Sequence, residues 1–179
     1  INLKLNISFL PVQLLFIIHK KKNLSENSLL KPTNIYGITK RNCEKIILKK
    51  LKKPSNAIIF RFFNVCSSLY KKHKIGEFHS PETPLIPIAV SKFLKKKKIN
   101  IYGNNFNTKD GTCIRDYIHI KDLLKAFELG LKYLKKNNST ILNLGSNKGY
   151  SVLDICNIIK KILKIKKNNL IKIVKNRRG

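Results

Sequence analysis

The sequence predicts an α/β fold, and two patterns predict it. Residues 57–63 (AIIFRFF) form a short apolar run rich in β-branched and aromatic residues, which is typical of a buried parallel strand. Segments in which apolar residues recur at helical spacing precede and follow this run. A second short apolar run, residues 141–144, also lies between two segments with helical spacing. Strands that alternate with helices are typical of α/β architecture.

The first predicted helix covers residues 34–53. Pro32 precedes it, and Pro54 follows a lysine-rich last turn that suits the helix dipole. Five residues recur on one face at helical spacing: Tyr36, Lys40, Cys43, Ile47 and Leu51.

The remaining elements are predicted from the same signals. Residues 64–87, which contain Gly76 and three prolines, are expected to form a loop. Ser151 and Asp154 predict a capping box at the start of a helix, because each side chain can accept a backbone N–H there. The other elements expected are a helix at 88–94, a strand at 100–102, a helix at 122–136, a strand at 141–144 and a turn at 145–149.

The net charge of +29, from 38 basic and nine acidic residues, allows two interpretations. One is a nucleic-acid-binding protein. The other, which we favour, is a genome rich in A and T, whose codons enrich lysine, asparagine and isoleucine. The lysines are not interleaved with aromatic residues, and arginine occurs five times, so we expect no specific nucleic-acid partner.

Cysteine usage and hydropathy indicate a cytoplasmic protein without a membrane span. The four cysteines stand far apart and form no CxxC pair, which favours a reducing compartment and no disulfide framework. The apolar residues 7–18 are too few to cross a bilayer and contain Pro11. His119 has no second ligand at metal-binding spacing, so we expect a structural role for it and no metal site.

Three groups of residues are candidates for chemistry. Tyr36 and Lys40 stand at i and i+4, where an ammonium can lower the pKa of a phenol and make it a usable base. Asn64 follows the buried strand, at the edge where ligands bind in open α/β sheets. Arg115 could grip a diphosphate. Each also has a plain structural explanation: an amphipathic helix, a turn and a surface ion pair.

Taken together, the segments resemble the UDP-glucose 4-epimerase family of extended short-chain dehydrogenases/reductases. They occur in the family's order, over about residues 24–179, and the fourth of them is the most specific. The segments are YGITK, RFFN, IGEFHSPET, TKDGTCIRDYIH, NLGSNKGYSV and a final RRG. The resemblance implies the later strands of an incomplete Rossmann-type, doubly wound parallel sheet, with a small α/β substrate-binding domain.

The resemblance also implies roles for particular residues, with NAD as cofactor and a UDP-sugar as substrate. Tyr36 would be the base at the sugar 4-hydroxyl while UDP-glucose and UDP-galactose interconvert, and Lys40 would hold the nicotinamide ribose. Phe63 would lie beside the nicotinamide. The residues expected to line the UDP-sugar site are Asn64, Leu85, Tyr102, Arg115 and Arg178. A homodimer is expected for the full-length protein.

Two departures from the family pattern bear on activity. Pro84 stands where relatives often carry His or Asn, so a side-chain contact is lost. None of the eight glycines forms the dinucleotide-binding fingerprint that places a pyrophosphate at a helix N-terminus, so we expect an incomplete chain that is inactive alone. The alternatives are a UDP-glucuronate-type epimerase and a basic, polyanion-binding remnant of a decayed gene.

Residues 1–23 do not fit the family pattern. Relatives have a run of serines where this chain reads Phe9-Leu10-Pro11-Val12-Gln13. Moving the reading frame back by one base can turn the codons of Leu10, Pro11 and Val12 into serine codons. We therefore expect that residues 1–23 are read out of frame, the alternative being a genuine but divergent strand.

Overall fold

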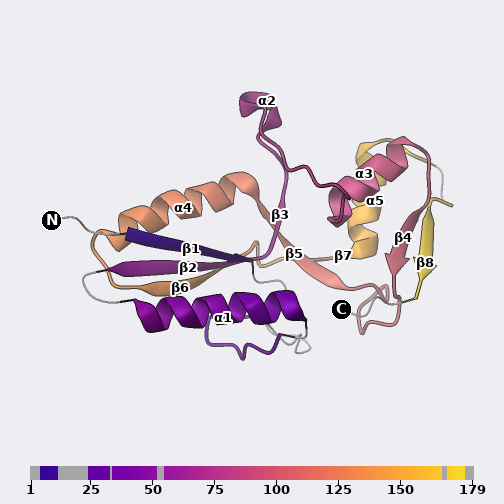
Figure 1. Ribbon diagram of the computed structural model, residues 1–179. Coiled ribbons are helices and arrows are strands. Elements are labelled where there is room, and N and C mark those ends of the chain that lie inside the picture. Colours follow the sequence, from indigo (N-terminus) through magenta and orange to yellow (C-terminus); the bar gives the residue numbers. More distant parts are fainter. Residues whose placement is uncertain (1–4, 12–23, 33, 52–54, 167–168, 176–179) are drawn as a thin grey trace. The chain divides into compact units, whose positions relative to one another are not determined.

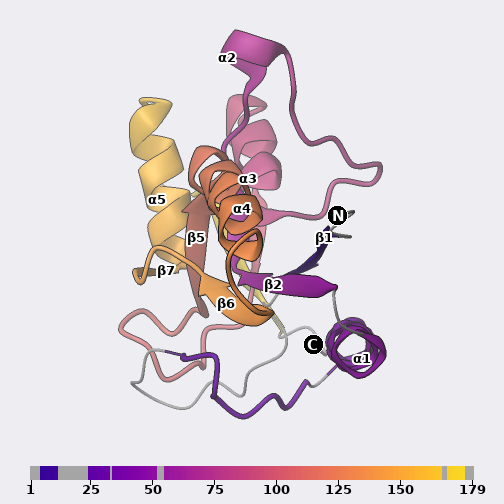
Figure 2. The same ribbon diagram turned by 90° about the vertical axis from the view of Figure 1, so that its left-hand side faces the viewer.

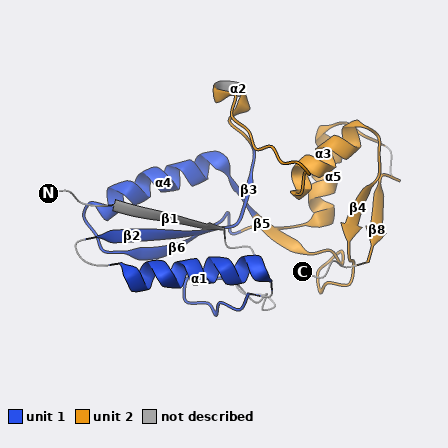
Figure 3. Ribbon diagram, viewed as in Figure 1, with its two compact units in different colours: residues 1–67, 117–147, 179 blue, residues 68–116, 148–178 orange. Residues whose placement is uncertain are grey.

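The structure, a computed structural model, describes residues 5–11, 24–32, 34–51, 55–166 and 169–175. Figure 1 traces the chain, and Figure 3 colours its two compact units. Unit 1 comprises residues 1–67, 117–147 and 179, and unit 2 comprises residues 68–116 and 148–178. Each unit is therefore built from two separate stretches of the chain.

Unit 1 contains a parallel sheet with β2 (Asn56–Phe62) in the middle. Its neighbours are β1 (Leu5–Pro11) and β6 (Thr140–Leu144), and both pair with β2 in parallel. Residues 57–61 of β2 are buried, as the apolar run predicted. The residues here called β1 belong to the segment that we expect to be out of frame, and that expectation stays a prediction; residues 1–4 and 12–23 lie outside the described residues.

Two helices cover the sheet of unit 1 on opposite sides, α1 (Ile35–Lys50) and α4 (Ile120–Leu134). Figure 2 shows the same arrangement from the side. Phe60 of β2 packs against Phe127 of α4 with ring centres 5.4 Å apart, and Ile58 and Leu134 complete a buried cluster with Phe60. The α/β prediction with parallel strands is confirmed.

The predicted loop at residues 64–87 is wrong in part. β3 (Asn64–Cys66) pairs in parallel with β5 (Ile114–His119), a strand that the sequence did not predict. The four-residue helix α2 (Tyr70–His73) follows. α3 (Leu85–Leu94) begins three residues earlier than predicted. Pro87 is compatible with this start because it lies in the first turn, where backbone N–H groups make no hydrogen bond within the helix, so proline disrupts none.

Unit 2 is also α/β. β4 (Ile99–Tyr102) pairs in parallel with β8 (Ile171–Val174), and the start of β5 pairs antiparallel with β7 (Gly149–Ser151). Neither β7 nor β8 was predicted, because each is only three or four residues long. α3 packs against α5 (Val152–Ile162) and β4 around buried residues that include Ala89, Phe93, Cys156 and Leu170.

Lysines occupy the left-handed position after three helices. Lys74, Lys96 and Lys164 have φ angles of 57°, 52° and 55° at the ends of α2, α3 and α5. After α5 the N–H of Ile165 bonds to the carbonyl of Lys160, and after α3 the N–H of Lys97 bonds to Lys92. These bonds close Schellman motifs, in which glycine is the usual residue at the left-handed position.

No described helix combines the length and apolar character needed to cross a bilayer.

Gly130 provides a test of the packing in unit 1. It is buried in α4, and a Cβ there would lie 2.6 Å from Cζ of the fully buried Phe60. We expect Gly130→Ala to lower the free energy of unfolding by about 1 kcal/mol or more, although alanine is the better helix former. Urea unfolding measures the change. Leu129→Ala, at a half-exposed position of the same helix, is the control and should change stability less. A stabilised Gly130→Ala chain would contradict this packing.

Candidate active site

Tyr36 and Lys40 lie one turn apart near the start of α1. Asn34 caps this helix, since its side-chain oxygen accepts the N–H of Gly37 at 2.9 Å. The Lys40 ammonium lies over the face of the Tyr36 ring, 5.2 Å from its centre, which is a cation–π contact. The prediction that the two side chains share a helix face is therefore confirmed.

In the chain alone, burial sets the direction of the pKa shift of the Tyr36 phenol. Partial burial of Tyr36, which is 46% exposed, disfavours the phenolate and raises its pKa above the ordinary value of 10.0. Lys40 contacts the ring face, where its charge interacts with the π system. The prediction that Lys40, helped by the charge of the cofactor, lowers the pKa of Tyr36 concerns the NAD-bound protein and stays a prediction.

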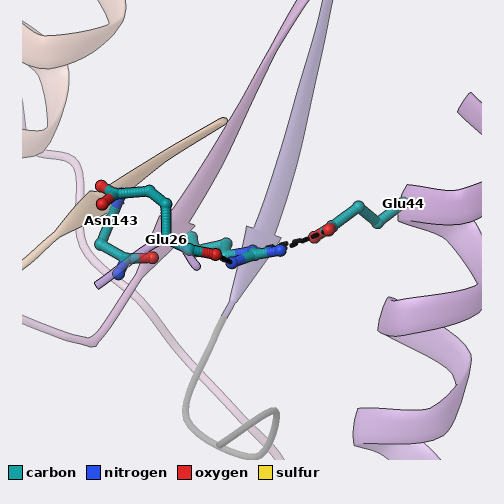
Figure 4. A network of polar contacts seen from close by, with 4 residues as sticks. Glu26, Glu44 and Asn143 are labelled. Carbon is teal, nitrogen blue, oxygen red and sulfur yellow. Dashed lines mark hydrogen bonds and ion pairs between the residues drawn. The ribbon is translucent and has the colours of Figure 1, made fainter. Parts of the chain in front are cut away.

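A buried arginine joins α1 to the sheet. Arg61 of β2 donates from Nε and Nη2 to the two carboxylate oxygens of Glu44 in α1, at 3.0 and 2.5 Å. Both residues are buried, with 3% of Arg61 and 4% of Glu44 exposed. Figure 4 shows these contacts together with Glu26, whose backbone carbonyl accepts from Nη1 of Arg61 at 2.9 Å.

Glu26 connects the same network to β6. Its carboxylate accepts the backbone N–H of Asn143 at 2.7 Å, and the Asn143 amide donates to the carbonyl of Leu24 at 3.1 Å. The segment that precedes α1 is thereby hydrogen-bonded to β2 and β6 near their carboxyl ends. Glu44 was missed in the sequence. A buried arginine in β2 was the available signal, because a buried guanidinium requires a partner of opposite charge.

Phe63 and Asn64 lie where β2 ends and β3 begins. The N–H of Phe63 donates to the carbonyl of Leu144 at 3.0 Å, which extends the pairing of β2 with β6 by one residue. Asn64 pairs with Tyr117 in the parallel ladder between β3 and β5. Both residues therefore follow the carboxyl end of a central parallel strand, where ligands of open α/β sheets bind.

The other predicted substrate residues belong to unit 2. Leu85 is the first residue of α3, after Pro84, and Tyr102 is the last residue of β4. Arg115 lies on β5, where its Nη1 donates to the carbonyl of Ile114 at 2.9 Å. Arg178 lies outside the described residues. Tyr36, Lys40, Phe63 and Asn64 thus belong to one unit and Leu85, Tyr102 and Arg115 to the other.

The TKDGTC stretch forms a hydrogen-bonded loop within unit 2. The Asp110 carboxylate accepts the backbone N–H and the hydroxyl of Thr112, both at 2.8 Å, and a short bond from the Ser151 hydroxyl. Ser151 also caps α5 with Asp154, so the predicted capping box is confirmed. A Cβ on Gly111 would lie 2.1 Å from the carbonyl oxygen of Asn104, which excludes a side chain there.

His119 has the structural position that the sequence favoured. It is the N-cap residue of α4, and its Nδ1 accepts the N–H of Lys121 at 3.1 Å. Among the residues that the structure describes, no group of three or more His, Cys, Asp or Glu side chains could hold a metal ion.

Comparison with known proteins decides the family. The sequence profile of the NAD dependent epimerase/dehydratase family matches residues 17–145, which is more than half of the chain. The chain belongs to this family. The matched span includes seven of the predicted site residues: Tyr36, Lys40, Phe63, Asn64, Leu85, Tyr102 and Arg115.

The chain spans about half the length of the relatives that it matches. It is 41% identical over 148 residues to the UDP-glucose 4-epimerase of Lactobacillus helveticus, an alignment that covers 81% of this chain and 44% of that protein. Its fold matches a UDP-glucose 4-epimerase from Brucella ovis in complex with NAD, at a TM-score of 0.83 and 29% identity. It also matches one from Stenotrophomonas maltophila with bound NAD and formylated UDP-arabinopyranose, at 0.85 and 25%. These two matches cover 98% of this chain and 54% and 52% of those chains.

The hydrogen bonds at Asp110 predict an acid-dependent stability. Burial alone would raise the pKa of this carboxyl, but the bonds from Ser151 and Thr112 outweigh burial and hold the pKa below its ordinary value of 3.8. A carboxyl with a lowered pKa stabilises the fold above its ordinary pKa, and this contribution is lost as the pH falls through the folded-state value.

We therefore expect Asp110→Asn to lower the free energy of unfolding by about 1 kcal/mol at neutral pH and by less in acid. Urea unfolding of the parent and the variant at neutral pH and at about pH 2 measures how the loss of stability depends on pH. Glu82→Gln is the control, because Glu82 accepts a longer bond, 3.2 Å, from its neighbour Thr83. An effect of Asp110→Asn that does not depend on pH would contradict the role given to the charge.

Proposed function

We propose that this chain is the carboxyl-terminal, sugar-binding and proton-transferring part of a UDP-glucose 4-epimerase, which interconverts UDP-glucose and UDP-galactose with NAD. One observation carries the proposal: a span matched by the family profile includes the Tyr36–Lys40 pair, and the structure gives that pair one helix face. The 41% identity to the Lactobacillus helveticus enzyme supports UDP-glucose as the substrate class.

In this proposal Tyr36 takes the proton from the sugar 4-hydroxyl and later returns it. The raised pKa of Tyr36 means that the phenol is protonated at neutral pH in the chain alone, so an added positive charge is needed to make it a base. Lys40 already lies over the ring and holds the nicotinamide ribose in the same proposal. Asn64, Leu85, Tyr102, Arg115 and Arg178 bind the UDP-sugar.

The chain fits one half of an NAD site. When bound, NAD would supply the oxidation and reduction at sugar C4, and its positive nicotinamide would add the charge that lowers the Tyr36 pKa. Tyr36, Lys40 and Phe63 are in the elements that would hold the nicotinamide end. The fingerprint that would hold the pyrophosphate is not in these 179 residues. We therefore propose that the chain alone binds NAD weakly and does not turn over.

We propose a homodimer for the full-length protein and a cytoplasmic location. α1 carries exposed apolar side chains at Ile35, Ile46 and Leu48, which supports a partner on that helix. The four cysteines, Cys43, Cys66, Cys113 and Cys156, are free thiols, and the proposed location is a reducing compartment.

The assignment of Tyr36 is tested in a fusion that places the amino-terminal half of the Lactobacillus helveticus enzyme before Leu24. We expect the purified 179-residue chain to show no turnover of UDP-galactose in a coupled assay with NAD, and the fusion to be active. Tyr36→Phe in the fusion should lower kcat by about 10² to 10⁴, because the general base is lost.

Tyr133→Phe, a half-exposed tyrosine of α4, is the matched control and should stay within about three-fold of the parent. A Tyr36→Phe fusion that kept its kcat would rule out the base. Turnover of UDP-glucuronate in preference to UDP-galactose would support the alternative, a uronate-type epimerase.

The polyanion-binding alternative makes a separate prediction. We expect weak binding to DNA or heparin that is lost at moderate salt and shows no sequence preference, because lysines act as point charges on phosphates. Fluorescence anisotropy with DNAs of different sequence across a salt series measures it. A sequence preference, or binding that persists in salt, would favour the nucleic-acid interpretation.

A further inference from the structure

The buried Glu44–Arg61 pair lies on the same two elements as the proposed catalytic residues. Tyr36, Lys40 and Glu44 follow one another at intervals of four residues along α1, so they share a helix face. Arg61 stands two residues before Phe63 and three before Asn64. The pair therefore connects the face of α1 that carries Tyr36 to the end of β2 that is followed by Phe63 and Asn64.

The bonds of Arg61 fix both distance and orientation. Its planar guanidinium donates to both oxygens of Glu44, at 3.0 and 2.5 Å, and this two-point contact permits little rotation between the groups. A third donor reaches the backbone carbonyl of Glu26 at 2.9 Å. A lysine could not reproduce this geometry, because it offers a single point charge.

Stability alone is a poor explanation for this pair. Burying two charges costs hydration, and well-packed apolar residues often stabilise such a site equally well. The chain has nine acidic residues against 38 basic ones, yet one of the nine, Glu44, is buried with its carboxylate on this arginine. What an apolar replacement cannot supply is a directed contact that sets where α1 lies on β2.

We propose that Glu44 and Arg61 are positioning residues that fix α1 on β2 and thereby set the location and burial of Tyr36. This inference rests on the proposed function for its catalytic meaning, since Tyr36 acts as the base there. Its structural content, the dependence of the Tyr36 environment on the pair, is a property of the chain alone and can be measured without turnover.

The experiment uses the 179-residue chain labelled with 3-fluorotyrosine, whose phenol titrates at a lower pH than that of tyrosine. Fluorine NMR follows each tyrosine separately, and Tyr36→Phe assigns the Tyr36 signal. Three variants are compared with the parent: Glu44→Gln, the double variant Glu44→Met with Arg61→Met, and the control Glu128→Gln, which removes an exposed carboxylate from α4.

We expect Glu44→Gln and the double variant to shift the titration of residue 36 downward, because its burial raises the pKa and depends on the position of α1. Glu128→Gln should leave that titration unchanged. The double variant should recover most of the stability that Glu44→Gln loses and still show the shift. A pair that only stabilises would instead give a double variant with the titration of the parent, and that result would overturn the proposal.

The active fusion adds a kinetic measurement. There Glu44→Gln should lower kcat by about 10-fold to 100-fold with a much smaller change in KM, because a small misplacement of a catalytic group affects the chemical step. An unchanged kcat would count against the proposal. A fusion without any turnover would instead contradict the proposed function, and the fluorine titration would still test the positioning role.

Discussion

The charge of Arg61 is the constraint on which unit 1 depends. A guanidinium that is 3% exposed cannot be neutralised by losing its proton, so its hydration must be replaced by fixed partners. Glu44 supplies the opposite charge from α1, and Glu26 supplies a carbonyl from the segment before that helix. Because Glu26 also binds Asn143 of β6, Arg61 and its two partners link β2, α1, the segment before α1 and β6. Removing one partner of such a buried pair typically costs about 3–5 kcal/mol.

Unit 2 uses an acidic residue in a corresponding way. Asp110 binds Thr112 within its own loop and Ser151 at the start of α5, and the Thr112 hydroxyl accepts the N–H of Leu153 at 3.3 Å. The TKDGTCIRDYIH segment is the strongest part of the family resemblance, and much of it is engaged in these bonds and in β5. A segment that is characteristic of a family therefore need not contact the substrate. Within this segment, Arg115 is the residue that we propose to bind the UDP-sugar.

Local pattern predicted the long elements and their burial: the buried run of β2, the helices α1, α4 and α5, and the capping box at Ser151. It did not predict β3, β7 or β8, which have three or four residues each and carry little pattern of their own. It also missed β5, whose six residues include the charged Arg115 and Asp116 and so do not form an apolar run. The pairing of Glu44 with Arg61 joins residues 17 positions apart, which spacing on one helix cannot reveal. The position of the Lys40 ammonium over the ring face of Tyr36 is likewise a detail that helical spacing alone does not give.

The lysines that end α2, α3 and α5 connect the composition of the chain to its backbone. A left-handed conformation costs a residue with a Cβ about 1 kcal/mol relative to glycine, and Lys74, Lys96 and Lys164 all adopt it. If base composition of the genome supplies the lysines, then mutational bias has reached positions where backbone geometry opposes it. Some of these lysines then destabilise the fold, which lowers its free energy of unfolding. A smaller free energy of unfolding leaves the chain less tolerant of further destabilising substitutions.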